Sequence, residues 1–189
     1  MKNNKFALII GIGGAGGNIL SYIYNNLKSE LSIEYLALNT DMQALTTLDM
    51  PILNKYLIGE SLTGGTGAGA DPDKGRLAAI ESSKFIQNII KSNHYHIVFI
   101  IVAKLCKSMG LYTFAICSTP FSFEGYLRQR QAAEGIAKLK PCVDNITIFS
   151  NDNIINSVNS VSFVDAFRIS DKYFILPIKI MLSILQDHG

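Results

Sequence analysis

A glycine-rich run near the start of the chain could bind a phosphate group. Five of the seven residues from Gly11 to Gly17 are glycines, and Asn18 follows them. Glycine has no Cβ, so a ligand can approach the backbone closely. An apolar run precedes the glycines and an apolar-periodic helix follows, whose free N–H groups attract an anion. The run predicts a nucleotide cradle, whereas a turn that needs glycine only for packing is the weaker alternative.

Two classes of nucleotide remain open from this run alone. Residues Gly11–Gly16 satisfy the pattern G-x-G-x-x-G, and Asp41 follows the next predicted strand. That combination is typical of dinucleotide-binding folds, but the glycine motif is weak on its own. The additional glycines and Asn18 are not part of it.

A ring and a carboxylate near the end of the chain could recognise a base. Phe167 and Asp171 lie four residues apart, so on a helix they share one face. A stacking ring beside a carboxylate suits guanine, whose N1–H and 2-amino group are adjacent hydrogen-bond donors. Considered without further information, Phe167 in the core and Asp171 at the surface is the preferred interpretation. Glu124 and Arg128 are also four apart, which predicts an ion pair worth a few tenths of a kcal/mol, roughly.

A second glycine run could form another ligand-binding loop. Thr63–Ala70 reads TGGTGAGA and is followed by Asp71 and Pro72, which are residue types typical of a helix N-cap and first turn. The run therefore leads to a second helix N-terminus. Contact with a ligand is the favoured interpretation, and a mobile surface loop is the alternative.

The segments between these motifs predict an α/β fold of Rossmann-like type, a mostly parallel sheet with helices on both faces. A helix is expected from Asp71 through Ile90, another up to Lys140, and a long apolar one over Phe163–Leu185 with a kink at Pro177. After the strand that precedes Gly11, the expected strands are Ile33–Asn39, His96–Ile101, Leu111–Ser118 and Asp144–Phe149, with Pro51–Ile58 irregular or a short strand.

The interval between two of these strands is unusually short. Val102–Met109 has helical composition and Gly110 would end the helix. A parallel crossover with its helix needs at least about 10–12 residues. Either the strand His96–Ile101 is cut short, or a loop that belongs here is absent.

Composition excludes several classes of partner. The chain has 189 residues, 48% of them apolar, and a net charge of +2 with scattered basic residues. Nucleic-acid and membrane binding therefore have no electrostatic support. Cys106, Cys117 and Cys142 are widely spaced, which fits a reduced, cytoplasmic protein better than a disulfide framework or a zinc site. Neither a signal peptide nor an apolar segment of about 20 residues is expected.

The chain resembles the FtsZ family, the bacterial homologues of tubulin. The likeness covers nearly the whole chain, in the order of the family, and is far more specific than a single glycine motif. The matching segments are GIGGAGGN (Gly11–Asn18), LALNTDMQAL (Leu36–Leu45), IGESLT through GAGADPDKGRLAAIES (Ile58–Ser82), PFSFEGYLRQRQAAEGIAKLK (Pro120–Lys140), VDNITIFSND (Val143–Asp152) and FVDAFRISD (Phe163–Asp171).

The resemblance implies a GTP or GDP site, with Mg²⁺ as a possible companion of GTP. It also implies GTP hydrolysis coupled to head-to-tail polymerisation into the division ring. The implied contacts are Gly13, Gly14, Gly17 and Asn18 for the phosphates and the approach to the base; Asn39, Asp41, Ala68, Gly69 and Ala70 near the terminal phosphate and magnesium; Glu124 and Arg128 for the ribose; and Asn151, Phe167 and Asp171 for guanine. On this basis the guanine interpretation of Phe167 and Asp171 replaces the interpretation of Phe167 as a core residue and Asp171 as a surface residue.

Two departures from the family pattern matter. The family's signature loop, a GGGTGTG run after the third main strand, is missing near residue 101, where the crossover is too short. The run Gly64–Gly69 resembles that signature, but its flanks match an earlier loop, so a displaced signature is the lesser alternative. The expected organisation is a GTP-binding domain over residues 1–170 and the start of a central helix over 171–189, without the second domain and its catalytic acidic loop. Apolar residues of that helix, namely Ile178, Met181, Leu182 and Leu185, are then expected to be exposed.

The sequence therefore predicts an FtsZ-like nucleotide-binding domain whose hydrolysis is impaired, with guanine nucleotide and FtsZ filaments, or its own copies, as partners. No catalytic or metal-binding residue is assigned. One alternative is a degenerate product without activity, and another is a non-catalytic chain that caps full-length filaments. A third, an NAD-dependent oxidoreductase using Gly11–Gly16 and Asp41, lacks a substrate domain.

Overall fold

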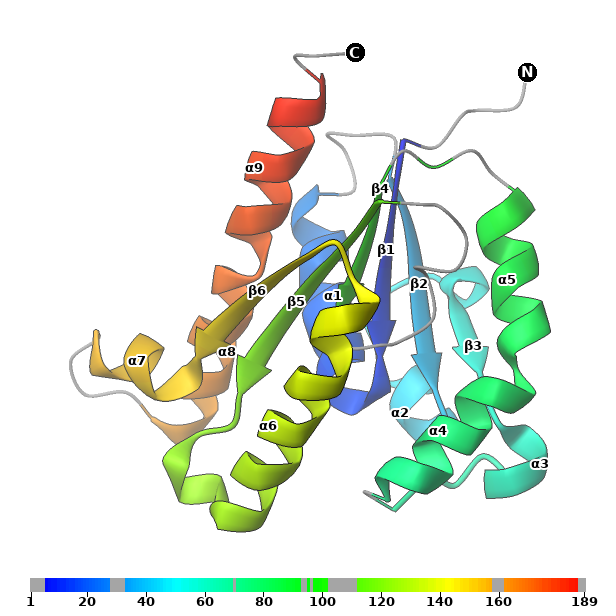
Figure 1. Ribbon diagram of the computed structural model, residues 1–189, viewed down its shortest axis with the longest axis horizontal. Helices are drawn as coiled ribbons and strands as arrows, with labels where there is room; N and C mark the ends of the chain where they lie inside the picture. Colours follow the sequence, from blue (N-terminus) through cyan, green and yellow to red (C-terminus); the bar gives the residue numbers. More distant parts are fainter. Residues whose placement is uncertain are drawn as a thin grey trace.

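The computed structural model describes residues 6–27, 33–69, 71–92, 95, 97–101, 112–157 and 162–186. Within them, a six-stranded parallel sheet in the order β3-β2-β1-β4-β5-β6 forms the centre of the molecule, with helices on both faces (Figure 1). The strands are β1 (Ala7–Ile12), β2 (Ile33–Asn39), β3 (Lys55–Leu57), β4 (Ile97–Ile101), β5 (Tyr112–Thr119) and β6 (Asn145–Ser150). The predicted α/β fold with a mostly parallel sheet is confirmed.

The strand order places β1, and the glycine turn that follows it, at the middle of the sheet. β1 pairs with β2 on one side and with β4 on the other, and the chain reverses its direction of growth across the sheet between β3 and β4. In open α/β sheets such a reversal leaves a crevice beyond the carboxyl ends of the strands, where ligands bind. The predicted segment Val102–Met109 lies outside the described residues.

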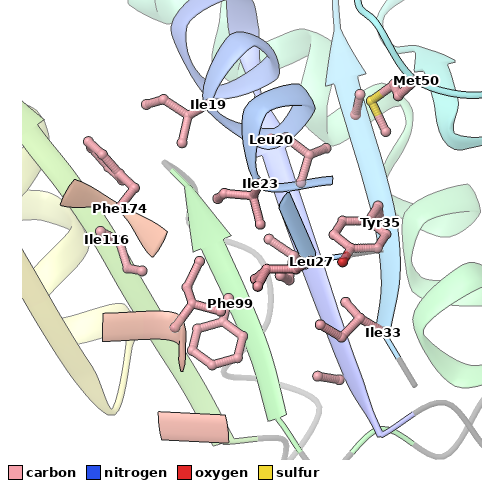
Figure 2. Packing of buried hydrophobic residues seen from close by; sticks show 14 of the residues in the cluster. Ile19, Leu20, Ile23, Leu27, Ile33, Tyr35, Met50, Phe99, Ile116 and Phe174 are labelled. Carbon is pink, nitrogen blue, oxygen red and sulfur yellow. The ribbon is translucent and has the colours of Figure 1, made fainter. Parts of the chain in front are cut away.

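One face of the sheet is covered by the helices α1 (Gly13–Leu27), α8 (Phe163–Tyr173) and α9 (Ile175–Gln186). Ile19, Leu20, Ile23 and Leu27 of α1 point into this core, as Figure 2 shows, because they recur at helical spacing. Phe174, between the last two helices, packs into the same cluster.

The opposite face is covered by two separate groups of helices. α4 (Pro72–Glu81) leads into α5 (Ser83–Ser92), whose Ile86 and Ile90 pack on β1, β2 and β4. α6 (Tyr126–Leu139) packs on β5 and β6 (Figure 1). Three short helices, α2 (Met42–Thr46), α3 (Glu60–Thr63) and α7 (Asn151–Asn156), follow strands at the edge where the glycine turn lies.

Two of the predicted helices are each divided in two. The one expected from Asp71 to Ile90 breaks at Ser82 into α4 and α5, although Asp71 and Pro72 take the N-cap and first-turn positions as predicted. The long helix expected over Phe163–Leu185 breaks at Phe174 rather than at Pro177. Pro177 falls in the first turn of α9, where its missing N–H leaves no helical bond unmade.

The expected exposure of the last helix is wrong for its central residues. Ile178 and Leu182 are 0% and 1% exposed and belong to the core cluster under α1, and Met181 is half-buried. The side chain of Leu185 lies outside the described residues. The side chains of Leu176, Ile180 and Ile184 are the exposed ones instead. Among the described residues, no helix combines the length and apolar character that crossing a membrane requires.

Gly135 provides a test of the helical assignment of α6. It is exposed in the middle of the helix, and a Cβ at this position would meet no atom within 4 Å. Gly135→Ala should therefore raise the free energy of unfolding by about 0.5–1 kcal/mol, because alanine loses less backbone entropy in a helix. Urea unfolding followed by circular dichroism measures the change, and a destabilised variant would contradict the assignment.

Candidate nucleotide-binding site

A cavity of about 540 Å³ opens at the carboxyl end of the sheet, between the start of α1 and the middle of α8. Its volume is in the range of small-molecule sites. The lining residues are Gly14, Ala15, Asn18, Ile19, Ser118, Pro120, Glu124, Arg128, Asn151, Phe167, Ser170 and Asp171. Seven of the residues singled out from the sequence thus come together, although they are distributed over most of the chain.

The glycine turn brings the N-terminus of α1 to this cavity. Gly13 has a φ of 73°, which an L-residue rarely adopts, and α1 begins there. Gly14, Ala15 and Asn18 then follow in the first turns and line the cavity. Gly17 is not part of the lining, since it is buried and a Cβ there would lie 3.2 Å from Leu48 Cδ1. The helix start therefore offers unpaired N–H groups and positive potential to an anion.

Phe167 and Asp171 share one face of α8, as their spacing predicts, and both line the cavity. Their burial does not fit the interpretation made without the resemblance, Phe167 in the core and Asp171 at the surface, because Phe167 is 39% exposed and Asp171 is half-buried. The rings of Phe167 and Phe121 are nearly perpendicular with 4.9 Å between their centroids, and Phe121 is stacked on Phe123. Partial burial raises the pKa of Asp171 to about 6.

Glu124 and Arg128 form the predicted ion pair. Arg128 Nη1 donates to Glu124 Oε2 at 3.0 Å, while the other carboxylate oxygen, Oε1, accepts from the backbone N–H of Phe121 at 2.9 Å. Glu124 lies in a 3₁₀ turn over Ser122–Glu124, directly before α6. Both of its oxygens are therefore engaged by the chain itself. A ribose hydroxyl would have to share or displace one of these contacts.

The second glycine run lies beside the end of β2, away from the cavity lining. Gly67 N–H donates to Thr40 O at 3.0 Å, and Met42 N–H donates to Gly65 O at 2.9 Å. Asn39 and Asp41 border this loop, and Ala68 and Gly69 continue it, but none of the four lines the cavity. Ala70 lies outside the described residues. Backbone hydrogen bonds thus hold this glycine loop against the segment that follows β2.

The residues near the expected magnesium position do not form a metal site by themselves. Asp41 caps α2, with its Oδ1 accepting from Ala44 N–H at 3.1 Å. In the described part of the chain, no three His, Cys, Asp or Glu side chains come close enough to hold an ion together. A Mg²⁺ ion here would have to take most of its ligands from phosphates and water.

Sequence reasoning missed two hydroxyl residues of the lining, Ser118 and Ser170. Ser118 is at the end of β5, and Ser170 precedes Asp171 on α8. Ser170 Oγ donates to Asn151 Oδ1 at 2.6 Å. No pattern in the sequence indicates this contact, because it depends on how α7 packs against α8.

Taken together, the cavity can hold a purine nucleotide. Phe167 offers a ring for stacking, Asp171 offers a hydrogen-bond acceptor, and the start of α1 offers backbone donors for an anion. These three functions lie along one cavity. The backbone donors come from near the start of the chain, whereas the ring and the carboxylate come from α8.

Comparison with known proteins agrees with this fold. The cell division protein FtsZ of Buchnera aphidicola subsp. Baizongia pistaciae is 36% identical over 183 residues, covering 89% of this chain and 46% of the relative. An FtsZ structure from M. jannaschii, the W319Y mutant, superposes with a TM-score of 0.82 at 30% identity, covering 94% of this chain and 56% of that one. The chain spans about half the length of these relatives.

A more distant structure shares the fold alone. CetZ2 from Haloferax volcanii, a GTPγS-bound protofilament, superposes with a TM-score of 0.80 at 17% identity, covering 94% of this chain and 58% of that one. The model of the Tubulin/FtsZ family GTPase domain matches residues 7–159. The oxidoreductase alternative finds no support in these comparisons. The chain belongs to the Tubulin/FtsZ family, and its described core is that family's GTPase domain.

Proposed function

We propose that this domain binds a guanine nucleotide in the cavity between α1 and α8. The phosphates lie at the N-terminus of α1 near Gly14, and the base lies between Phe167 and Asp171. The observation that carries the proposal is that one cavity joins all of these groups. The Mg²⁺ that accompanies GTP would be held chiefly by the nucleotide, as the described side chains offer no cluster of ligands.

The cellular role proposed for the chain is that of an FtsZ-like division protein acting through GTP-dependent assembly. The relative from Buchnera is a cell division protein, and CetZ2 shows that one protein of this fold assembles into a protofilament with a GTP analogue. Hydrolysis by this chain is expected to be weak. Its sequence has no glycine run between Ile100 and Leu111, where the family carries its signature loop. Each lost backbone bond to phosphate is worth about 1.5–3 kcal/mol.

A side-by-side titration with fluorescent GTP and fluorescent NAD tests the proposed ligand. We expect saturable binding of the guanine nucleotide, competition by unlabelled GDP, and no saturation with NAD. Phosphate release measured on the same sample is expected to be slow. Saturation by NAD without competition by GDP would overturn the proposal, and turnover comparable to intact FtsZ would overturn the expectation of weak hydrolysis.

Co-sedimentation with full-length FtsZ filaments separates two alternatives, a non-catalytic chain that caps filaments and a degenerate product without activity. The capping alternative predicts that substoichiometric amounts of this chain shorten filaments or reduce the pelleted fraction. An inactive product leaves the pelleted fraction unchanged.

The affinity for guanosine should fall as the pH is lowered through about 6, the raised pKa of Asp171. The ionised carboxylate accepts hydrogen bonds from N1–H and the 2-amino group, and protonation removes one acceptor. In the protein without ligand, the same carboxyl group makes the stability of the fold depend on pH in the opposite direction. Because the folded pKa lies above the usual value of 3.8, this group stabilises the fold most at low pH, and its contribution is lost as the pH rises from about 4 to about 6.

Guanosine is the probe for this measurement, since terminal phosphates also titrate near pH 6. Isothermal titration calorimetry between pH 5 and 8 gives the affinity. The Asp171→Asn variant is the control and should show a nearly flat profile. A flat profile for the unmodified protein would contradict the assignment of Asp171 to the base.

A further inference from the structure

The strand β6 forms an open edge of the central sheet. It is last in the strand order and pairs with β5 over six consecutive residues, Asn145–Ser150, without a bulge. Phe149 O faces β5, where it accepts a hydrogen bond from Thr119 Oγ1 at 3.5 Å. Because backbone groups alternate in direction along a strand, the N–H and C=O groups of Ile146 and Ile148 face away from β5. Among the described residues, no strand lies on that side (Figure 1).

The opposite edge of the sheet is protected in a way that β6 is not. β3 is only three residues long and begins with Lys55. Short length and a charged side chain are two of the devices that keep an edge strand from pairing with other chains. β6 has six residues, NITIFS, without a charge or a proline. An edge of this kind is a template for one more strand.

A groove beside β6 provides space for a side chain of such a strand. It has a volume of about 630 Å³ and lies between α6 and β6. Its apolar lining comes from Ala133, Ile136 and Ala137 of α6 and from Ile148 of β6. Ile146 packs against the core under α6, whereas the side chain of Ile148 is 38% exposed. An apolar side chain of an added strand would cover Ile148 and fill the groove.

The other face of β6 also offers apolar surface. The ring of Phe149 points to that face, with its centroid 6.3 Å from that of Tyr173 and 5.6 Å from that of Phe174. Tyr173, at the end of α8, remains 39% exposed. Successive side chains of a strand point to opposite faces, so an added strand would meet apolar surface on both. Its central residues should therefore be apolar throughout, as in a strand that is buried on both faces.

Two charged residues line the groove near the two ends of β6. Lys140 follows the last turn of α6, shortly before β6 begins, and Asp152 comes directly after β6 in α7. Asp152 Oδ1 accepts from Ser122 N–H at 2.9 Å. Within the described ranges, neither Lys140 nor Asp152 forms an ion pair. A segment antiparallel to β6 would bring its first residues to Asp152 and its last residues to Lys140, so a basic start and an acidic end are complementary to this edge.

We propose that β6 accepts an extended segment of a different polypeptide as an additional, antiparallel strand. The segment has an uncharged, apolar centre, a basic residue at its start and an acidic residue at its end. Main-chain bonds to β6 supply affinity, and the groove supplies side-chain specificity. A thin segment fits better than a second folded copy, because α7 projects beside the carboxyl end of β6 (Figure 1). The proposal does not depend on nucleotide binding, which is assigned to the cavity between α1 and α8.

Hydrogen exchange tests the edge itself, with the acetylated and amidated peptide KTVIVTE as the probe. In ¹⁵N-labelled protein without peptide, the amides of Ile146 and Ile148 should exchange faster than those of Thr147 and Phe149, which face β5. A saturating amount of peptide should slow exchange at Ile146 and Ile148 by about tenfold or more. Protection of these two amides in the free protein, or no protection at millimolar peptide, would overturn the proposal.

Two methylated peptides test whether the main chains pair. One carries N-methyl groups at its third and fifth residues, and the other at its fourth and sixth. In a paired strand only alternate N–H groups face the neighbour. One of the two peptides should therefore bind about tenfold or more weakly than the other. Equal affinities, measured by calorimetry, would mean that the groove binds side chains without strand pairing, and the proposal would be wrong.

A charge exchange tests the direction of the segment. The unmodified protein should prefer KTVIVTE to KTVIVTK by about two- to fivefold, the worth of an exposed ion pair. Lys140→Glu should reverse this preference, and it changes only an exposed side chain. A preference that is the same in both proteins would contradict the antiparallel direction.

Light scattering separates the proposed partner from a second copy of the chain. We expect the free protein to show no dimer that depends on β6. Ile148→Pro removes an N–H group that faces away from β5, a change that an edge strand tolerates, and it should abolish peptide binding while the protein stays folded. A dimer of the unmodified protein that Ile148→Pro dissociates would show that a second copy occupies this edge, which would overturn the proposal.

Discussion

Gly11→Ala should lower the free energy of unfolding by about 3 kcal/mol, a large part of the roughly 5–15 kcal/mol that a domain possesses. An added Cβ would lie 2.4 Å from the backbone oxygen of Gly16 and 2.7 Å from Leu20 Cβ. Neither atom belongs to the flexible end of a side chain. The variant can relieve the overlap only by moving β1 and α1 apart, which loosens the core between them.

Gly14→Ala is the matched control for this substitution. Gly14 is three residues further on, a Cβ there meets no atom within 4 Å, and the residue lines the cavity. Its unfolding free energy should stay within about 0.5–1 kcal/mol of the original value. Its affinity for nucleotide should fall, because the methyl group enters the space assigned to phosphate. Urea unfolding and nucleotide titration of both variants give the comparison, and a Gly11→Ala variant of normal stability would contradict the close approach of strand and helix.

Asp171→Ala should abolish the preference for GTP over ATP. Two hydrogen bonds from a guanine to a carboxylate are charge-assisted, and each is worth about 1.5–3 kcal/mol, so the affinity for GTP should fall by about a hundredfold or more. ATP makes no such bonds to Asp171, and its weak binding should change little. Competition against a fluorescent nucleotide measures both affinities in the two proteins.

The control for the lost charge is Asp73→Ala. Asp73 is on α4, is largely exposed and pairs with Arg76 at the surface. This variant removes one negative charge far from the cavity and should keep the GTP preference. If Asp171→Ala also keeps its preference, the base is held elsewhere and the assignment of α8 is wrong.

The parts of the fold that follow from local chemistry could be predicted from the sequence. β2 spans Ile33–Asn39 as expected, because a largely apolar run is closed by polar residues. Asp71 and Pro72 start α4 as their capping chemistry requires. Phe167 and Asp171 share a face because helical spacing dictates it.

The parts that depend on packing between distant segments could not be predicted. The break at Phe174 places that ring in the core and turns Ile178 and Leu182 inward under α1, which hydrophobic periodicity alone does not indicate in a helix that is apolar all round. The contact of Ser170 with Asn151 likewise needs the position of α7 against α8.

The cavity also has a consequence for the order in which the protein is made. Gly14 and Asp171, which are far apart in the sequence, both line it. A ribosome synthesises the glycine turn early and releases α8 only after most of the chain has emerged. A ligand that needs both residues therefore cannot help the first strands to fold during translation, and it can act only once α8 docks beside α1.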